Sequence, residues 1–307
     1  MKTNSVIQEL SLHPIGTVRN IRLWMKRDDL LHPLISGNKW RKLAPIVELA
    51  QSDGIKGIIS FGGPYSNHLH ALAAAGREYN FPTVAIVRGL AADPDNPTLA
   101  FARACGMQII PVSKKAYDEG VNHPDIQQVI TRFDGFEVLP EGGASEAAVH
   151  NCAFLAEELL SEPIWSRKVY VAVPAGSGCT AAGLIRGLAG RAHTVLFPAT
   201  ASGFTAAHLL RFGVCESSLY TIEKRFDCGG FAAWNTELIA FIRQFKSDEG
   251  ILLDPFYTGK MMYGLFRMLQ EGFFPEGSNV VAIHTGGLQG WDGFRRRFGI
   301  SWETHTG

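Results

Sequence analysis

The chain has 307 residues, of which 46% are hydrophobic and 19% are charged. A chain of this length buries roughly three quarters of its unfolded surface, so we expect a core of its own, and the composition excludes intrinsic disorder, collagen and coiled coil. Lys and Arg together number 29, as do Asp and Glu, so the formal net charge is zero. Without a basic excess, neither a nucleic acid nor a membrane surface is an expected partner.

No segment approaches the roughly 18 unbroken apolar residues of a membrane-spanning helix, and residues 1–12 lack the apolar core of a signal peptide. We therefore expect a cytoplasmic protein. The five cysteines are scattered without a Cys-x-x-Cys pair, which predicts small buried thiols rather than disulfides or a metal site. Glycine is in excess, with 33 residues where an average usage of ~7% gives about 21, and its clustering predicts backbone built to approach a ligand closely.

Strand-like and helix-like segments alternate along the chain from Gly57 onward. Short β-branched runs predict strands, and longer amphipathic stretches predict helices. In chain order the predicted elements are strand 57–61, helix 66–79, strand 83–88, helix 98–105, strand 107–112, helix 124–133, strand 136–139, helix 145–160, strand 168–173, helix 179–188, strand 193–197, helices 205–212 and 235–245, strand 251–253, helix 259–269, strand 279–284 and helix 287–297. This pattern predicts parallel sheets with helices on both faces, in two α/β domains with a boundary near residues 141–144.

The first polar cluster lies near the N-terminus, where Gly37-Asn38 predicts a turn and the next residues predict a helix. Lys39 falls in the first helical turn, and Lys42 falls one turn later on the same face. Each ammonium disfavours the charge on the other and so lowers its pKa, which is what Schiff-base chemistry requires of a lysine. A solvated basic face at a helix start has the same pattern, so this cluster alone leaves both readings open.

The second polar cluster follows the first predicted strand and a Gly-Gly-Pro turn. Ser66 is a natural N-cap, and the N–H groups at the start of its helix can hold a carboxylate. Asn67 can donate a hydrogen bond to an aromatic hydroxyl or phenolate. An ordinary connection between a strand and a helix is the alternative. His68 and His70 are two residues apart and diverge on a helix, so they do not predict a metal site.

The third polar cluster follows the predicted strand 168–173 and leads into a helix. Its residues are Ala175, Gly176, Ser177, Gly178, Cys179, Thr180 and Ala181. Glycine-rich backbone at a helix N-terminus binds phosphate through its N–H groups. Ala181 stands where a dinucleotide motif has its third glycine, and no Gly-Lys-Ser/Thr follows. A nucleotide loop is therefore excluded, and a single phosphate monoester is the favoured ligand.

Two further segments carry hydroxyl groups and glycines near the C-terminus. Residues 254–260 precede a predicted helix, residues 284–287 follow a predicted strand, and residues 227–231 form another tight loop. Ligands bind at the C-terminal ends of the strands in open parallel sheets. An early lysine, a phosphate loop without a nucleotide motif and loops bearing hydroxyls together indicate pyridoxal 5'-phosphate.

These motifs, taken in order, give the chain a family resemblance. Residues 37–43, 66–68, 176–183, 254–260 and 284–287 resemble the D-cysteine desulfhydrase and 1-aminocyclopropane-1-carboxylate deaminase family, which belongs to the tryptophan synthase β-like (fold type II) pyridoxal-phosphate enzymes. The resemblance implies an α/β fold with two open, twisted, mostly parallel sheets and helices on both faces. It implies a large cofactor-binding domain of residues 1–45 and 144–307, and a smaller inserted α/β domain of residues 46–143. It also implies a homodimer that acts on a small amino acid, with the cofactor between the domains.

The resemblance also implies roles for single residues. Lys39, Ser66 and Tyr257 would be catalytic, with Lys39 holding the cofactor covalently and later moving the Cα proton. Tyr257 would stand beside the cofactor ring and the substrate, and Thr285 would face the pyridine nitrogen. The substrate carboxylate would be received by Ser66, Asn67 and His68, and Asn67 would also bind the 3'-oxygen of the cofactor. The phosphate would be wrapped by Ala175, Gly176, Ser177, Gly178, Cys179, Thr180 and Ala181, with Lys42 nearby.

Two activities occur among proteins that resemble this chain. The deaminases carry a glutamate directly after the tyrosine and a glutamine after Ser-Asn, where this chain has Thr258 and His68. A neutral hydroxyl at the pyridine nitrogen, the place expected for Thr285, leaves that nitrogen largely unprotonated. The cofactor ring is then a weaker electron sink, which suits elimination of a good leaving group. The expected reaction is therefore β-elimination from a small D-amino acid, with D-cysteine giving pyruvate, ammonia and sulfide.

Two alternatives stay open at this point. One is deamination of 1-aminocyclopropane-1-carboxylate to 2-oxobutanoate and ammonia. The other is a pyridoxal-phosphate-binding protein with little turnover. The second alternative arises at Phe231, an expected substrate contact, because many desulfhydrases have a second tyrosine at this place.

Overall fold

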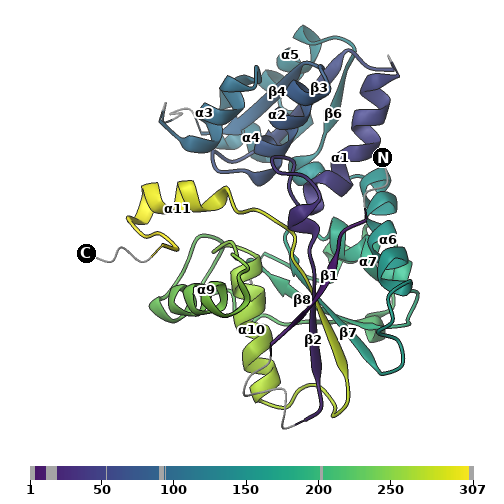
Figure 1. Ribbon diagram of the computed structural model, residues 1–307. Helices are drawn as coiled ribbons and strands as arrows, with labels where there is room; N and C mark the ends of the chain where they lie inside the picture. The colour runs from purple at the N-terminus through teal and green to yellow at the C-terminus, as the bar shows by residue number, and fades with distance from the viewer. Residues whose placement is uncertain are drawn as a thin grey trace. The chain divides into compact units, whose positions relative to one another are not determined.

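The chain divides into two compact units in the computed structural model, which describes residues 4–11, 19–52, 54–89, 93, 95–200 and 203–303 (Figure 1). The first unit comprises Met1–Leu31, Ser36–Asn38 and Val149–Gly307, and the second comprises His32–Ile35 and Lys39–Ala148. The sequence placed the changes of domain at residues 46 and 144. Helix α1 (Asn38–Gln51) runs across the first of these positions, and from Lys39 on it goes with the second unit.

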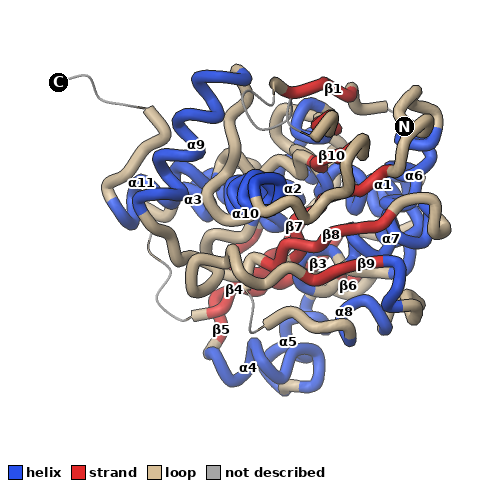
Figure 2. The backbone as a smooth tube through the Cα atoms, turned by 90° about the horizontal axis from the view of Figure 1, so that it is seen from below, coloured by secondary structure: helices blue, strands red, loops and turns tan. Residues whose placement is uncertain are grey.

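The first unit contains a six-stranded sheet with the strand order β1-β2-β10-β7-β8-β9. Every neighbouring pair is parallel except β1 with β2, and Figure 2 shows β7, β8 and β9 running side by side. The strands β7 and β10 are buried along their whole length, which explains why both are apolar except for Asn279 at the start of β10. The strands are β1 (Ile7–Leu10), β2 (Arg22–Lys26), β7 (Val169–Ala175), β8 (His193–Pro198), β9 (Tyr220–Ile222) and β10 (Asn279–Ile283).

Helices cover both faces of this sheet. Figure 1 shows α9 and α10 on one face and α6 and α7 on the other. The helices of the unit are α6 (Glu146–Leu160), which begins within the second unit, α7 (Cys179–Leu188), α8 (Ala207–Leu210), α9 (Thr236–Glu249), α10 (Thr258–Gln270) and α11 (Gly290–Phe298).

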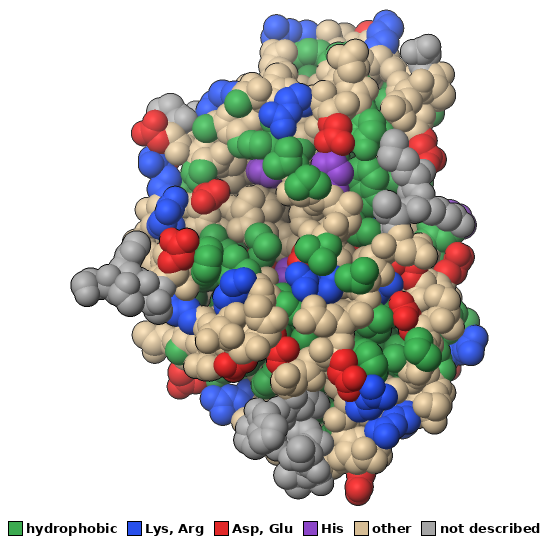
Figure 3. Space-filling model, in the orientation of Figure 1, with side chains coloured by type: hydrophobic (Ala, Val, Ile, Leu, Met, Phe, Trp, Pro, Cys, Tyr) green, Lys and Arg blue, Asp and Glu red, His purple; other side chains and the backbone are tan. Residues whose placement is uncertain are grey.

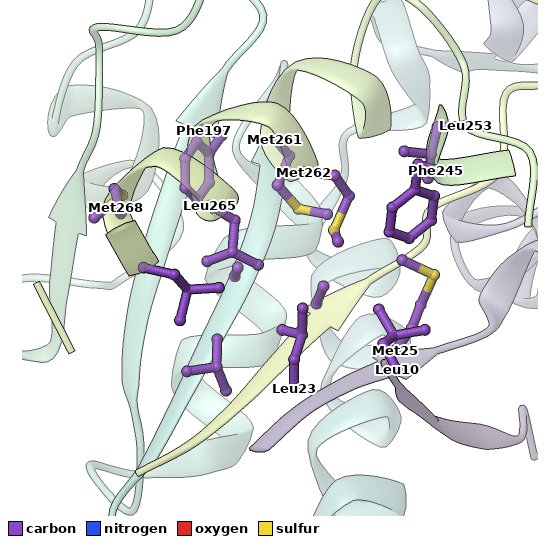
Figure 4. Close-up of a cluster of buried hydrophobic side chains, with 14 of the residues drawn as sticks. Leu10, Leu23, Met25, Phe197, Phe245, Leu253, Met261, Met262, Leu265 and Met268 are labelled. Atoms are coloured by element: carbon purple, nitrogen blue, oxygen red, sulfur yellow. The ribbon is translucent and has the colours of Figure 1, made fainter. Parts of the chain in front are cut away.

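The core of the first unit fixes helix α10 on the sheet (Figure 4). Met261, Met262 and Met268 of this helix are fully buried in one hydrophobic cluster with Leu23 and Met25 of β2. Full burial of a side chain of this size contributes about 1.5–3 kcal/mol. Because these buried side chains pack α10 on the sheet, the turn at the start of the helix is held in a fixed position.

The second unit contains a four-stranded sheet, all parallel, with the strand order β5-β4-β3-β6. Its strands are β3 (Gly57–Gly62), β4 (Thr83–Arg88), β5 (Gln108–Val112) and β6 (Phe136–Leu139). Besides α1, its helices are α2 (Asn67–Glu78), α3 (Pro97–Ala104), α4 (Lys114–Glu119) and α5 (Pro124–Arg132). Ala116 of α4 and Ile126 of α5 pack on Ile59 and Ile86 of the sheet, while α2 and α3 pack on each other.

The prediction of mostly parallel sheets flanked by helices is confirmed. The predicted strand 251–253 is wrong, because its backbone accepts side-chain hydrogen bonds instead of joining a sheet: His284 Nε2 donates to Leu252 O at 2.8 Å, and Trp291 Nε1 donates to Leu253 O at 2.8 Å. The predicted helix 205–212 shrinks to Ala207–Leu210. The sequence also missed β1, β2, β9 and α4.

Surface and cysteine chemistry add two findings. Acidic and basic side chains are intermixed on the face shown in Figure 3, and no helix within the described ranges is long and apolar enough to cross a membrane. All five cysteines are free. Cys105, Cys152 and Cys179 are buried as expected, but Cys228 is half-buried and Cys215 is exposed, so the prediction of buried thiols is wrong for these two.

Candidate active site

The loop between β7 and α7 has the shape of an anion cradle. Strand β7 ends at Ala175, α7 begins at Cys179, and the N-cap residue, Gly178, has no side chain that could cap the helix. Gly178, the residue before the helix, has a φ of +84°, and a Cβ there would lie 2.8 Å from the backbone oxygen of His208. Because the first N–H groups of a helix have no partner within the helix, this start can bind an anion such as phosphate.

Two side chains from distant parts of the sequence support this cradle. Asn38 Nδ2 donates a hydrogen bond to Thr180 Oγ1 at 3.0 Å, and Arg211 Nη2 donates to the carbonyl oxygen of Ser177 at 2.5 Å. The cradle has no Lys or Arg of its own between residues 175 and 183, so Arg211 brings a positive charge that sequence reasoning missed. No local pattern marks Arg211, because only the fold carries it to the loop.

The Gly37-Asn38 motif meets the His284–Gly287 motif within the first unit. Asn38 N donates to Thr285 O at 3.2 Å. Gly37 has a φ of +64°, and a Cβ there would lie 1.8 Å from the same oxygen, so only glycine permits this approach. His284 Nε2 donates to Leu252 O, and its Nδ1 accepts from Gly286 N. These contacts hold Thr285 in place at the end of β10.

A buried carboxylate shapes the turn that carries Tyr257. Asp254 accepts hydrogen bonds from the N–H groups of Phe256, Tyr257 and Thr258, and from Thr258 Oγ1 at 2.6 Å. Burial raises the pKa of Asp254, and the four hydrogen bonds work against this rise. A Cβ at Gly176 would lie 3.5 Å from Tyr257 Oη, so the tyrosine ring stands at the cradle. The hydroxyl of Thr258, in contrast, is engaged by Asp254.

Phe231 joins Tyr257 in an aromatic group. The ring of Phe231 stacks on Phe256 with centroids 5.5 Å apart and planes 10° apart, and it meets Tyr257 edge-on at 5.5 Å. Phe231 is 42% exposed. The Lys260 ammonium donates to three carbonyl oxygens of the loop 227–231, and burial lowers its pKa.

The lysines and the Ser-Asn-His motif belong to the second unit. Lys39 and Lys42 lie in the first turns of α1, and Lys42 Nζ donates to Gly142 O at 3.2 Å. Ser66 is the N-cap of α2, because its hydroxyl accepts from Leu69 N at 3.2 Å, which confirms the predicted cap. Helix α2 then begins at Asn67.

His68 is a buried, neutral imidazole. It is 2% exposed, and its Nε2 lies 2.8 Å from Ser60 Oγ, which in turn lies 3.0 Å from Leu139 O. Burial and the charges of Lys39 and Lys42 hold the pKa of His68 well below its usual value. The Ser60 hydrogen bond is a second contact that the sequence did not reveal, because it joins β3 to α2 through the packing of the unit.

The structure thus brings the expected residues together in two sets. Within the first unit, the cradle adjoins Tyr257, and Tyr257 adjoins Phe231, while Asn38 joins the cradle to Thr285. Within the second unit, the charges of Lys39 and Lys42 act on His68, which directly follows Ser66 and Asn67 in the sequence. Over the described part of the chain, no three His, Cys, Asp or Glu side chains converge as a metal site would require.

Comparisons with known proteins agree with one another. Residues 9–286 match the family described as "Pyridoxal-phosphate dependent enzyme". The bifunctional D-cysteine desulfhydrase/1-aminocyclopropane-1-carboxylate deaminase, mitochondrial, of Arabidopsis thaliana is 29% identical over 90% of this chain and 74% of its own. A putative 1-aminocyclopropane-1-carboxylate deaminase of Thermotoga maritima is 28% identical over 87% and 89%. A solved structure of an ACC deaminase homologue has a TM-score of 0.79 and 26% identity, covering 94% of this chain and 91% of that chain.

Proposed function

The chain belongs to the pyridoxal-phosphate-dependent enzymes, and from this premise we propose that it is a lyase of small D-amino acids. D-cysteine is the substrate we favour, and with one water molecule it gives pyruvate, ammonia and hydrogen sulfide. The proposal rests on the neutral side chains at the residues expected near the pyridine nitrogen.

The residues present fit the cofactor. The cradle suits a phosphate, because the start of α7 supplies N–H donors and the position of Gly178 leaves no room for a side chain. Tyr257 stands where it can flank an aromatic ring beside Gly176. Pyridoxal phosphate, when bound to an amino acid, withdraws electrons from Cα and makes its proton acidic. In our proposal it is held by residues 175–181, Lys42, Asn67, Tyr257 and Thr285.

The remaining roles fall to side chains of this chain. Lys39 holds the cofactor and moves the Cα proton. The N–H groups at the start of α2, with Ser66 and Asn67, bind the substrate carboxylate. His68 adjoins them but is neutral, so it adds no positive charge for the carboxylate. Phe231 lies against Tyr257 and contacts the substrate side chain.

One observation favours elimination over ring opening. The residue after Tyr257 is Thr258, whose buried hydroxyl is bonded to Asp254, and the residue after His284 is Thr285. Neither threonine brings a negative charge to the pyridine nitrogen. Since a nearby anion is what favours the protonated ring, the cofactor here is a weaker electron sink, and substrates that expel a good leaving group react best.

A second candidate function is deamination of 1-aminocyclopropane-1-carboxylate to 2-oxobutanoate. It is favoured by the names of relatives in Thermotoga maritima and Bradyrhizobium, which match most of this chain. A third candidate, cofactor binding with little turnover, is favoured by the hydroxyl-free ring of Phe231 next to Tyr257.

The deciding experiment measures products from a panel of amino acids. The holoenzyme is incubated with D-cysteine, L-cysteine, β-chloro-D-alanine and 1-aminocyclopropane-1-carboxylate, and pyruvate, sulfide and 2-oxobutanoate are quantified. We expect pyruvate from D-cysteine and β-chloro-D-alanine, with sulfide from the former. A preference for the cyclopropane substrate would overturn the proposal in favour of the deaminase, and a coloured protein without any product would favour the binding protein.

We also propose that the active species is a cytoplasmic homodimer. The family resemblance supports the dimer, and the five free cysteines support a reducing compartment such as the cytoplasm. Light scattering of the purified holoenzyme tests the first statement, and cell fractionation tests the second.

A further inference from the structure

One buried ammonium group holds the whole loop 227–231. Lys260 of α10 is 2% exposed, and its Nζ lies 2.7 Å from Asp227 O, 2.5 Å from Gly230 O and 3.3 Å from Phe231 O. An ammonium has three donors, and three carbonyl oxygens surround this one. The loop is thereby tied to α10, the same helix whose start carries Tyr257.

The loop needs such a tie, because the backbone conformation of Cys228 within it is unfavourable. Cys228, Gly229 and Gly230 have φ values of +58°, +94° and +139°. Positive φ is costly for a residue with a side chain, and a conformation of this kind persists only where surrounding contacts impose it. The three hydrogen bonds from Lys260 are contacts of that kind, since their acceptors lie both before and after Cys228 in the chain.

The fixed loop presents an aromatic ring at a defined place. Phe231 is stacked on Phe256 and meets Tyr257 edge-on, yet it remains 42% exposed. Tyr257 stands at Gly176 in the cradle. The ring of Phe231 therefore presents an apolar surface beside Tyr257, and it has no hydroxyl to offer a polar ligand.

We propose that Lys260 is a positioning residue that fixes Phe231 as an apolar wall, and that this wall selects amino acids with an apolar β-substituent. D-cysteine and its thioethers are the expected class, in preference to side chains that end in a hydroxyl, because a thiol behaves as a small apolar group. The inference rests on the proposed function for the place of Tyr257 beside the substrate. Each methylene buried against the ring strengthens binding about fourfold.

Binding of ligands without a leaving group tests the wall apart from turnover. D-alanine and D-norvaline are titrated into the holoenzyme by calorimetry, with their L-enantiomers in parallel. We expect norvaline of the accepted hand to bind roughly fifteenfold more tightly, as two buried methylenes predict. Phe231→Ser should abolish this preference, whereas Phe273→Ser, a change at another phenylalanine that is 42% exposed, should leave it intact. Equal binding of both ligands by the wild type overturns the wall, whether or not D-cysteine proves to be the substrate.

A second measurement tests Lys260 through the thiol of Cys228, which lies within the loop and is half-buried. In a Cys215→Ser background, Lys260→Met should make Cys228 react several-fold faster with a thiol reagent and should lower the norvaline preference to that of Phe231→Ser. Lys246→Met is the control, because Lys246 donates to Gly250 O at 2.7 Å at the end of α9. A change in only one of the two readouts, or in neither, overturns the positioning role.

Discussion

Helix α7 of the first unit and helix α2 of the second both follow a buried parallel strand and a glycine-containing turn, yet their first turns are built differently. Helix α7 starts after Gly178, a residue without a side chain that could cap it. Helix α2 starts after Ser66, whose hydroxyl accepts from Leu69 N. An uncapped start offers its N–H groups to a ligand, whereas a capped start has already satisfied one of them.

The two helix starts also differ in the positively charged side chains near them. The cradle at α7 has no Lys or Arg between residues 175 and 183, and Arg211 reaches it from a distant part of the sequence by donating to the carbonyl oxygen of Ser177. At α2, the charges of Lys39 and Lys42 act on the neighbouring His68. We therefore expect the start of α7 to bind its anion through backbone shape, and the start of α2 to depend on nearby charged side chains.

The largest expected effect follows from removing Lys39, one of the two lysines whose charges act on His68 near the start of α2. Lys39→Ala should lower kcat by at least about 10³-fold, because one side chain both holds the cofactor and moves a proton. Borohydride reduction of the wild type followed by mass spectrometry should place the cofactor on this lysine. Lys42→Ala is the matched control and should still form the adduct. An adduct on any other lysine would contradict the assignment.

The next largest effect should come from the cradle at α7. Gly178→Val should abolish cofactor binding, because its Cβ would meet the backbone of His208 at 2.8 Å and its φ is +84°. Thr180→Ala loses only the hydrogen bond from Asn38 and should weaken binding by about 1 kcal/mol. Cofactor absorbance after reconstitution measures both.

A control separates backbone strain from loss of the cradle. Gly213 also has a positive φ, of +75°, but a Cβ there would meet nothing within 4 Å. Gly213→Val should therefore strain the chain and retain the cofactor. If Gly178→Val and Thr180→Ala kept equal amounts of cofactor, the phosphate would have to bind elsewhere.

A smaller effect concerns the pH dependence of stability, and it arises from a buried histidine of α2. Burial lowers the pKa of His70 to about 4, and its ring stacks on Phe101. Because the unfolded chain binds this proton from about pH 6.5 downward while the folded chain does not, stability falls as the pH drops from about 6.5 towards 4. Between pH 7 and pH 4.5, the wild type should lose about 2 kcal/mol more than His70→Phe. Urea unfolding at both pH values measures the difference, and equal losses would show that His70 is not responsible.

The sequence was informative wherever local chemistry decides the structure. Ser66 was recognisable as a cap, and Gly178 as the residue before a helix, because the residues that decide each feature lie close together in the sequence. Arg211 and the bond between Ser60 and His68 were not recognisable, because they depend on how distant elements pack. The predicted strand 251–253 failed for a related reason, since side chains from two distant positions, His284 and Trp291, take the carbonyl groups that a sheet would use.

The smallest expected effect tests whether the cap of α2 has a second task. Ser66→Ala should lower the free energy of unfolding by about 1 kcal/mol through loss of the cap. If Ser66 also binds the substrate carboxylate, its loss should raise KM as well. Ser113 is the matched control, because it caps α4 of the same unit by accepting from Ala116 N at 3.1 Å. Ser113→Ala should therefore reduce stability by a similar amount and leave KM unchanged. Equal KM values for both variants would mean that Ser66 is a cap alone, and that the carboxylate depends on the backbone N–H groups of α2 and the charges near His68.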